Sequence, residues 1–233
     1  MATKRTYGEA CGIPRALDRV GERWALMIVR ELLLGPKRFT DLRTGLPAVS
    51  PDVLAQRLRE LNEAGVVQKR KLPPPAASQV YELTEWGFEL EPVVLALGRW
   101  GARAPAAPEG AGMSFDAHIT SLMTLFGPDL AEGFEANVEL RLDEQVFRAT
   151  VADGQFEIVR GEAVGPEVTI QTDPGTLIAL IHGRRPLAEA LTAGDIAIAG
   201  DEQVAERFLG LFPLPEPAMP EVPALLARLS YRR

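Results

Sequence analysis

The first hundred residues combine apolar stripes at helical spacing with two short segments of β type. Apolar residues over 24–33 recur at helical spacing and stop at Gly35-Pro36, which predicts a buried helix that ends at this pair. A short helix over 38–43 and a turn over 45–49 follow it. The pattern therefore predicts two helices joined to a third by a turn.

Three start signals mark the third helix. Ser50 is a preferred N-cap residue, Pro51 suits the first helical position and Asp52 suits the first turn. The helix runs to about Ala64 and ends at Gly65. Its apolar stripe consists of Leu54, Leu58 and Leu61.

The opposite face of this helix is polar. At about 100° per residue, Asp52, Gln56 and Arg59 point away from the leucines, with Arg57 and Glu60 on the flanks. We expect this face to be able to meet a groove of DNA, and we expect Arg57 to take part in a structural ion pair.

A basic hairpin follows the helix. Residues 66–72 and 79–83 are two predicted strands joined by the loop 73–78, and the first strand carries Lys69, Arg70 and Lys71. A helix-turn-helix followed by such a hairpin is the winged arrangement, in which the second helix enters the major groove and the hairpin contacts the backbone. The N-terminal part is therefore predicted to be a mainly α winged helix-turn-helix.

A further helix is expected from Thr84-Glu85 to Trp100. Pro92 lies inside it, so we expect a kink or a true start near that residue. Its apolar face is larger than a small winged domain needs for its own core, which predicts a dimer contact. The residues of this face are Leu90, Val93, Val94, Leu97 and Trp100.

Prolines and glycines over 102–112 interrupt both helix and strand patterns, so we place a domain boundary there. The predicted division is a first domain over 1–104, a linker over 105–112, a second domain over 113–215 and a tail over 216–233. The second domain is predicted to be α+β. Its expected strands are 136–142, 146–152, 156–160, 168–172 and 195–199, and its expected helices lie over 114–126, after Asp173, over 186–192 and after Asp201.

The charge is divided unevenly between these parts. The net charge is −7, but residues 1–105 carry a balance of +4 and residues 106–233 a balance of −11. Phosphate therefore attracts the first part and repels the second.

The first part resembles the HxlR family of winged-helix regulators. The motifs that carry the resemblance are Cys11-Gly12-Ile13-Pro14, Gly21-Glu22-Arg23-Trp24, Arg30-Glu31-Leu32, Gly35-Pro36-Lys37-Arg38-Phe39, Ser50-Pro51-Asp52-Val53-Leu54, Arg57-Leu58-Arg59-Glu60-Leu61, Tyr81-Glu82-Leu83-Thr84 and Leu97-Gly98-Arg99-Trp100-Gly101. The resemblance implies a homodimer with one winged helix per half-site. The N-terminal segment and the helix after the wing would form the subunit contact.

The second part resembles the sterol carrier protein type 2 family. The shared motifs are Ala152-Asp153-Gly154, Leu180-Ile181-His182-Gly183 and the stretch from Ala193 to Asp201. The resemblance implies a sheet backed by helices around an apolar cavity for lipid-like ligands. Residues available to line it are Leu122, Met123, Phe126, Leu177, Leu180, Ile181, Phe208, Leu211 and Phe212. For any single one of these residues, an ordinary packed core is the favoured interpretation.

The predicted DNA contacts combine the polar helix face, the entrance of the helix-turn-helix and the wing. They are Lys37, Arg38, Thr40, Ser50, Asp52, Gln56, Arg57, Arg59, Lys69, Arg70 and Lys71. The expected partners are a double-stranded DNA operator, a second copy of the chain and an apolar small molecule.

Other chemistry has little support. Cys11 is the one cysteine, and it is either a thiol sensor, helped by the nearby Arg15, or a small buried apolar residue. His118 and His182 form no zinc-ligand set, and no catalytic or nucleotide-binding motif occurs, so we expect no metal, no cofactor and no enzymatic activity.

The expected function is therefore DNA-binding regulation of transcription. The second domain is expected either to bind an apolar small molecule that controls the regulator or to serve as an extra interaction surface. The alternative is an apolar-ligand carrier that uses its winged helix only to dimerise. No apolar run is long enough for a membrane helix or resembles a signal peptide, so we expect a cytoplasmic protein.

Overall fold

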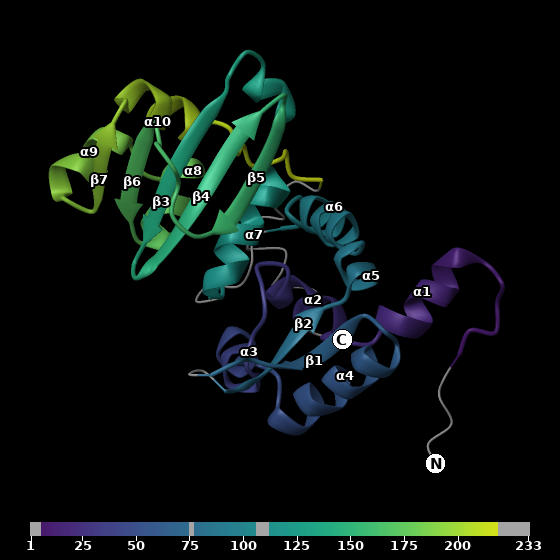
Figure 1. The fold of residues 1–233 in the computed structure, drawn as a ribbon. Coiled ribbons are helices and arrows are strands. Elements are labelled where there is room, and N and C mark those ends of the chain that lie inside the picture. The colour runs from purple at the N-terminus through teal and green to yellow at the C-terminus, as the bar shows by residue number, and fades with distance from the viewer. Residues whose placement is uncertain (1–5, 75–76, 106–111, 219–233) are drawn as a thin grey trace, which may run out of the picture.

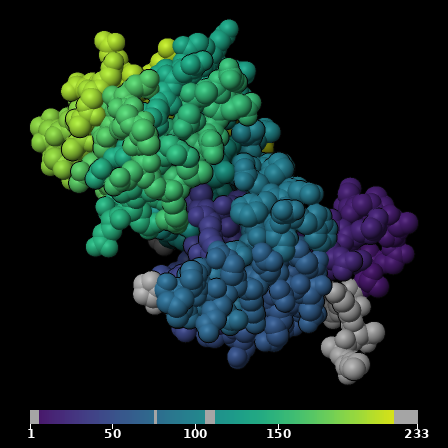
Figure 2. Space-filling view, viewed as in Figure 1, coloured from purple at the N-terminus to yellow at the C-terminus, as the bar shows by residue number. Residues whose placement is uncertain are grey.

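Two separate apolar cores organise the part of the chain that a computed structural model describes, which is residues 6–74, 77–105 and 112–218. One core belongs to an N-terminal lobe and the other to a C-terminal lobe, and Figure 2 shows the two lobes resting against each other. Residues 106–111 of the predicted linker and 219–233 of the predicted tail lie outside the described residues.

The N-terminal lobe is a helical winged helix-turn-helix (Figure 1). Strands β1 and β2 pair antiparallel, with Val67 opposite Leu83 at one end and Lys71 opposite Gln79 at the other. The elements are α1 (Gly12–Val20), α2 (Ala25–Leu32), α3 (Phe39–Gly45), α4 (Pro51–Glu63), β1 (Val67–Lys71), β2 (Gln79–Leu83), α5 (Glu85–Phe88) and α6 (Glu91–Gly101).

The predicted start of α4 is confirmed in its local geometry. The Ser50 hydroxyl accepts a hydrogen bond from the Val53 amide, and Pro51 occupies the first turn. Leu54, Leu58 and Leu61 are fully buried, as the stripe predicts.

Three details differ from the sequence prediction. Helix α1 was not expected, and α3 extends two residues further, to Gly45. Helix α2 begins at Ala25 because Trp24 adopts a left-handed conformation, with φ at 79°, which a helix cannot include.

The predicted interruption near Pro92 is confirmed. The segment after the wing consists of α5 and α6, which are separated at Glu89 and Leu90. Pro92 lies in the first turn of α6, where its missing N–H would have no partner within the helix.

The C-terminal lobe is α+β, as expected. Its five strands run in the order β5-β4-β3-β6-β7, and all neighbours pair antiparallel except β3 and β6, which pair parallel. Helices α7, α8 and α10 lie on one face of this sheet (Figure 1). The elements are α7 (Phe115–Leu125), the 3-10 helix η1 (Pro128–Ala131), β3 (Ala136–Leu142), β4 (Gln145–Ala152), β5 (Gln155–Arg160), β6 (Val168–Thr172), α8 (Pro174–Ile181), α9 (Leu187–Ala193), β7 (Ile196–Gly200) and α10 (Glu202–Leu209).

Caps and turns explain where the helices and strands of this lobe begin and end. Asp173 and Asp201 accept hydrogen bonds from the first amides of α8 and α10, and Ser114 does the same for α7. Asp153 and Gly154, both with positive φ, form the tight turn between β4 and β5. Within the described residues, the helices are too short or too polar to cross a membrane.

Candidate nucleic-acid interface and interdomain contact

Helix α4 presents the polar face that its sequence predicts. Asp52, Gln56 and Arg59 are exposed on the side opposite the buried leucines. The Gln56 amide nitrogen donates to the Glu60 carboxylate at 3.0 Å, a contact across one turn on the surface. A base edge in a groove could displace that contact, so these three residues remain available for recognition.

Arg57 has a structural role, as expected. Its guanidinium lies 3.1 Å from the Glu22 carboxylate and also pairs with Glu60 on the same helix. The pair with Glu22 connects α4 to the turn between α1 and α2, so Arg57 holds the helix in place.

A concave surface lies between α3 and the start of α4. It encloses about 690 Å³ and is lined by Thr40, Arg43, Thr44 and Ser50, among others. Arg43 and Thr44 were missed by the sequence analysis. Their position three and four residues after Thr40 would have placed them on the same helical face.

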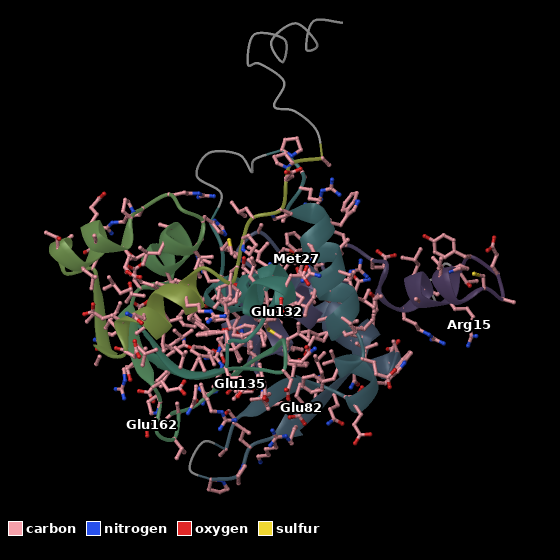
Figure 3. All side chains as sticks on the ribbon, turned by 90° about the horizontal axis from the view of Figure 1, so that it is seen from above. Arg15, Met27, Glu82, Glu132, Glu135 and Glu162 are labelled. Carbon is pink, nitrogen blue, oxygen red and sulfur yellow. The ribbon has the colours of Figure 1, made fainter. Side chains whose placement is uncertain are left out.

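The wing projects its cations outward. The last four residues of β1 are exposed, and the Lys69 ammonium lies 5.4 Å from the centre of the Tyr81 ring. The Arg70 guanidinium binds the Glu82 carboxylate through two oxygens, at 2.9 and 2.8 Å from Nε, and lowers the pKa of Glu82. Figure 3 shows Glu82 on this hairpin. Arg70 is therefore partly neutralised by Glu82, whereas neither Lys69 nor Lys71 forms an ion pair with any of the residues that the structure describes.

Lys37 lies in a different environment from the one expected for a phosphate contact. Its ammonium is 2.6 Å from Glu31 and 2.8 Å from Asp116, and only 16% of the side chain is exposed. Two carboxylates therefore draw the side chain into the contact between the lobes and away from the DNA-facing surface. Its neighbour Arg38 is exposed and replaces it as the cation at the entrance of the helix-turn-helix.

Glu31 is the buried centre of this contact. Its carboxylate is fully buried and accepts hydrogen bonds from Arg30 at 2.7 Å, Lys37 at 2.6 Å and the Ser114 hydroxyl at 2.6 Å. Burial by itself raises the pKa of Glu31, but the bonds from Lys37 and Ser114 outweigh it and hold the pKa below its ordinary value of 4.5. A Cβ at Gly45 would collide with this carboxylate, so a larger residue there would force the Glu31 side chain to move.

Asp116 extends the contact into the C-terminal lobe. Its side chain is 3% exposed and pairs with both Lys37 and Arg160. The Arg160 guanidinium lies 5.0 Å from the centre of the Phe147 ring and donates to the Leu34 carbonyl. We call this set the interdomain charge network; its members are Arg30, Glu31, Lys37, Ser114, Asp116 and Arg160.

The other end of α7 is held by α6. Arg99 donates to the carbonyl oxygens of Thr124 at 3.1 Å and Phe126 at 3.3 Å, which are carbonyls at the end of α7. A Cβ at Gly98 would lie 3.0 Å from the Thr124 methyl carbon, so the glycine allows the two helices to approach closely. Helix α7 therefore contacts the N-terminal lobe at both of its ends (Figure 1).

The predicted dimer residues divide into two groups. Val94 is buried in the N-terminal core and Leu90 packs against it. Val93, Leu97 and Trp100 are 51%, 48% and 74% exposed. The rest of the face of the described chain is therefore largely exposed to solvent.

A second unused apolar surface lies on α1. This helix projects from the lobe, as Figure 3 shows with Arg15, and its Ile13 and Leu17 are exposed. An open groove of about 600 Å³ separates α1 from α5, with Trp86 and Leu90 in its lining.

The residues predicted to line a ligand cavity fill the interior of the C-terminal lobe. All are buried in one core except Met123, which packs against it. The Phe212 ring lies 6.1 Å from Phe126 in a tilted arrangement and 5.3 Å from Phe208 in an edge-to-face arrangement, both measured between ring centres. Phe156, which was not predicted, completes this aromatic cluster at 5.1 Å from Phe212. Three concave surfaces of the described residues are lined by residues other than these.

Cys11 is exposed at the N-cap of α1, so the prediction that it is a small buried residue is wrong. The His118 ring nitrogen bonds to the Ser114 carbonyl, and burial lowers the pKa of His182. In the described ranges, no group of three or more His, Cys, Asp or Glu could hold a metal ion.

Comparisons with known proteins match each lobe separately. The model of the HxlR-like helix-turn-helix family matches residues 19–107, and that of the SCP-2 sterol transfer family matches residues 127–213. YdeP of Bacillus subtilis, named an HTH-type transcriptional regulator, is 36% identical over 97 residues, which cover 41% of this chain and 74% of that protein.

Two further regulators are similar to this chain. The HTH-type transcriptional regulator YodB of Bacillus subtilis is 35% identical over 85 residues, covering 36% of this chain and 76% of YodB. Among solved structures, the redox regulator HypR in its oxidized form is 31% identical, covers 42% of this chain and all of that chain, and gives a TM-score of 0.39.

We predict that Glu31→Gln lowers the free energy of unfolding by about 3 kcal/mol near neutral pH, because it removes the carboxylate that pairs with the partly buried Arg30 and leaves Lys37 with Asp116 alone. The folded-state pKa of Glu31 lies below 4.5, so its contribution is present above pH 4.5 and is lost as the pH falls. Urea unfolding between neutral and acid pH should therefore show a flatter acid decline in the variant. Glu189→Gln, which removes an exposed carboxylate beside Arg185, is the control and should leave both quantities unchanged.

Proposed function

The chain belongs to the HxlR-like helix-turn-helix family of transcriptional regulators, and from this premise we propose that it is a homodimeric, sequence-specific DNA-binding regulator controlled by an apolar molecule in its C-terminal lobe. The observation that carries the proposal is the exposed polar face of α4 beside a wing with uncompensated cations. A regulator that reads chromosomal DNA works where the DNA is, so we place the protein in the cytoplasm.

The proposed DNA surface has two kinds of contact. Asp52, Gln56 and Arg59 would face base edges in the major groove, where side-chain amides and guanidinium groups discriminate bases. The backbone contacts would come from the helix-turn-helix entrance and the wing, where cations meet phosphates. These residues are Arg38, Thr40, Arg43, Ser50, Lys69 and Lys71, with Arg70 contributing part of its charge.

The proposed dimer uses the apolar surfaces that one chain leaves uncovered. Val93, Leu97 and Trp100 on α6 and Ile13 and Leu17 on α1 are large apolar residues exposed in one chain. Monomeric proteins rarely expose apolar surface of this extent, whereas a second copy would bury it. The groove between α1 and α5 would lie in the same interface.

The proposed ligand site lies within the C-terminal core, and the match to the SCP-2 sterol transfer family supports it. Because the rings of Phe126, Phe156 and Phe212 pack against one another, an apolar molecule would have to separate them in order to enter. Such a ligand acts on DNA binding only through different affinities for two arrangements of the dimer. The alternative, an apolar-ligand carrier, does not explain why the wing carries exposed cations.

The DNA proposal predicts different effects for the two kinds of contact. Gln56→Ala should lose affinity mainly at one or two operator positions, by about 1–3 kcal/mol, because it removes base recognition. Lys69→Ala should weaken binding to all sequences and reduce the salt slope by about one. Fluorescence anisotropy over a salt series, on sites selected from random DNA and on the DNA upstream of the gene, measures both. Equal effects of the two substitutions on every sequence would contradict the assignment.

The dimer proposal predicts that Leu97→Glu produces a monomer in sedimentation experiments and lowers operator affinity, because a buried charge disrupts an apolar interface. Val164→Glu places the same charge on an apolar residue that is 87% exposed, on the C-terminal lobe, and should remain dimeric. A wild-type chain that sediments as a monomer at micromolar concentration would refute the proposal.

The ligand proposal predicts that a fluorescent fatty acid binds the protein with about one molecule per chain and shifts the affinity for the selected operator. An unlabelled fatty acid should compete. Binding without a shift in DNA affinity would support the carrier alternative. Absence of binding, together with intact operator binding, would leave the C-terminal lobe with an architectural role only.

A further inference from the structure

Helix α7 belongs to the C-terminal lobe, yet its polar contacts are with the N-terminal lobe at both ends. At its start, Ser114 donates to Glu31 and Asp116 pairs with Lys37. At its end, its carbonyls accept from Arg99 of α6. Helix α7 therefore joins the lobes independently of the linker, and Arg160 of β5 adds a further contact by donating to the Leu34 carbonyl.

Lys37 connects this helix to the base of the wing. Its amide donates to the Tyr81 carbonyl at 2.9 Å, and the Tyr81 amide donates back at 2.8 Å, so Lys37 forms a β-bridge with the middle of β2. The position of the Lys37 backbone and that of β2 are therefore fixed together. The Lys37 ammonium, in turn, is fixed by Glu31 and Asp116.

The residue opposite Tyr81 in the hairpin is one that we propose contacts phosphate. Lys69 is the register partner of Tyr81 in the hairpin, and its ammonium lies over the Tyr81 ring. A continuous set of contacts thus runs from Asp116 through Lys37 and Tyr81 to Lys69. Asp116 itself is 3% exposed and lies in the other lobe, so it cannot touch DNA in this arrangement.

We propose that Asp116 is a positioning residue for DNA binding, which holds the wing through Lys37 and makes the C-terminal lobe part of the DNA-reading unit. The proposal rests on the DNA-binding function proposed above. It identifies α7 as the element through which a change in the C-terminal lobe reaches DNA, because α7 contacts both the base of the wing and the helix that carries the dimer face.

The charges around Asp116 explain why its substitution would affect Lys37. Asp116 neutralises both Lys37 and Arg160, and its removal leaves Arg160 without a carboxylate in the network and Lys37 with Glu31 alone. A buried cation with fewer partners moves toward water or draws other groups to itself. Lys37 would then no longer hold β2 in one position.

The test compares Asp116→Asn with Glu139→Gln. Glu139 is a matched control, because it is also a buried carboxylate of the C-terminal lobe and pairs with Arg141, but it lies in β3, away from the contact between the lobes. Two quantities are measured on the full chain: affinity for the selected operator over a salt series, and hydrogen exchange of the wing amides.

We expect Asp116→Asn to weaken operator binding about tenfold, to reduce the salt slope by about one, as loss of the Lys69 contact would, and to speed exchange of the Lys37 and Tyr81 amides. Glu139→Gln should leave all three as in the wild type. Unchanged binding and exchange in Asp116→Asn, or equal losses in both variants, would overturn the proposal.

A double-mutant cycle separates positioning from general damage to the fold. Lys37→Met should reproduce the effect of Asp116→Asn, and the double variant should lose little more than either single variant, because both act on one contact. Additive losses would overturn the proposal. If the wild type binds no DNA specifically, the proposed function fails, while the exchange measurements still decide whether Asp116 holds the wing.

Discussion

A buried carboxylate fixes how the two lobes meet. Glu31 is fully buried, and an ionised carboxylate without donors would be too costly at that depth. Its donors come from α2, from the segment before α3 and from Ser114 at the start of α7, so its burial requires the C-terminal lobe to be in place. Charged side chains therefore connect the lobes directly, in addition to the linker.

Helix α6 contacts the core of its own lobe and helix α7, and it leaves a third face exposed. Val94 packs into the core of its own lobe, and Gly98 and Arg99 receive α7. Leu97 and Trp100 remain exposed. A dimer formed on the exposed face would lie on the same helix that contacts α7, so α6 would take part both in the proposed dimer and in the contact between the lobes.

The structure also changes how the positive charge of the N-terminal part is used. Three of the cations proposed from sequence take part in internal pairs: Lys37 with Glu31 and Asp116, Arg57 with Glu22, and Arg70 with Glu82. An ion pair lowers the attraction of a cation for phosphate. Counting basic residues along the chain therefore overestimates the charge available to DNA, and the missed Arg43 returns part of it.

The sequence by itself determined the local elements of this protein. The cap at Ser50, the leucine stripe of α4, the interruption at Pro92 and the Asp153-Gly154 turn depend on residues close together in the chain, which is why their patterns predict them. Only the tertiary structure decided which side chains meet across more than eighty residues, such as Glu31 with Ser114. It also decided that Lys37 faces the other lobe, because its partner Asp116 lies far away in the chain and comes close only when the two lobes pack together, which no local pattern records.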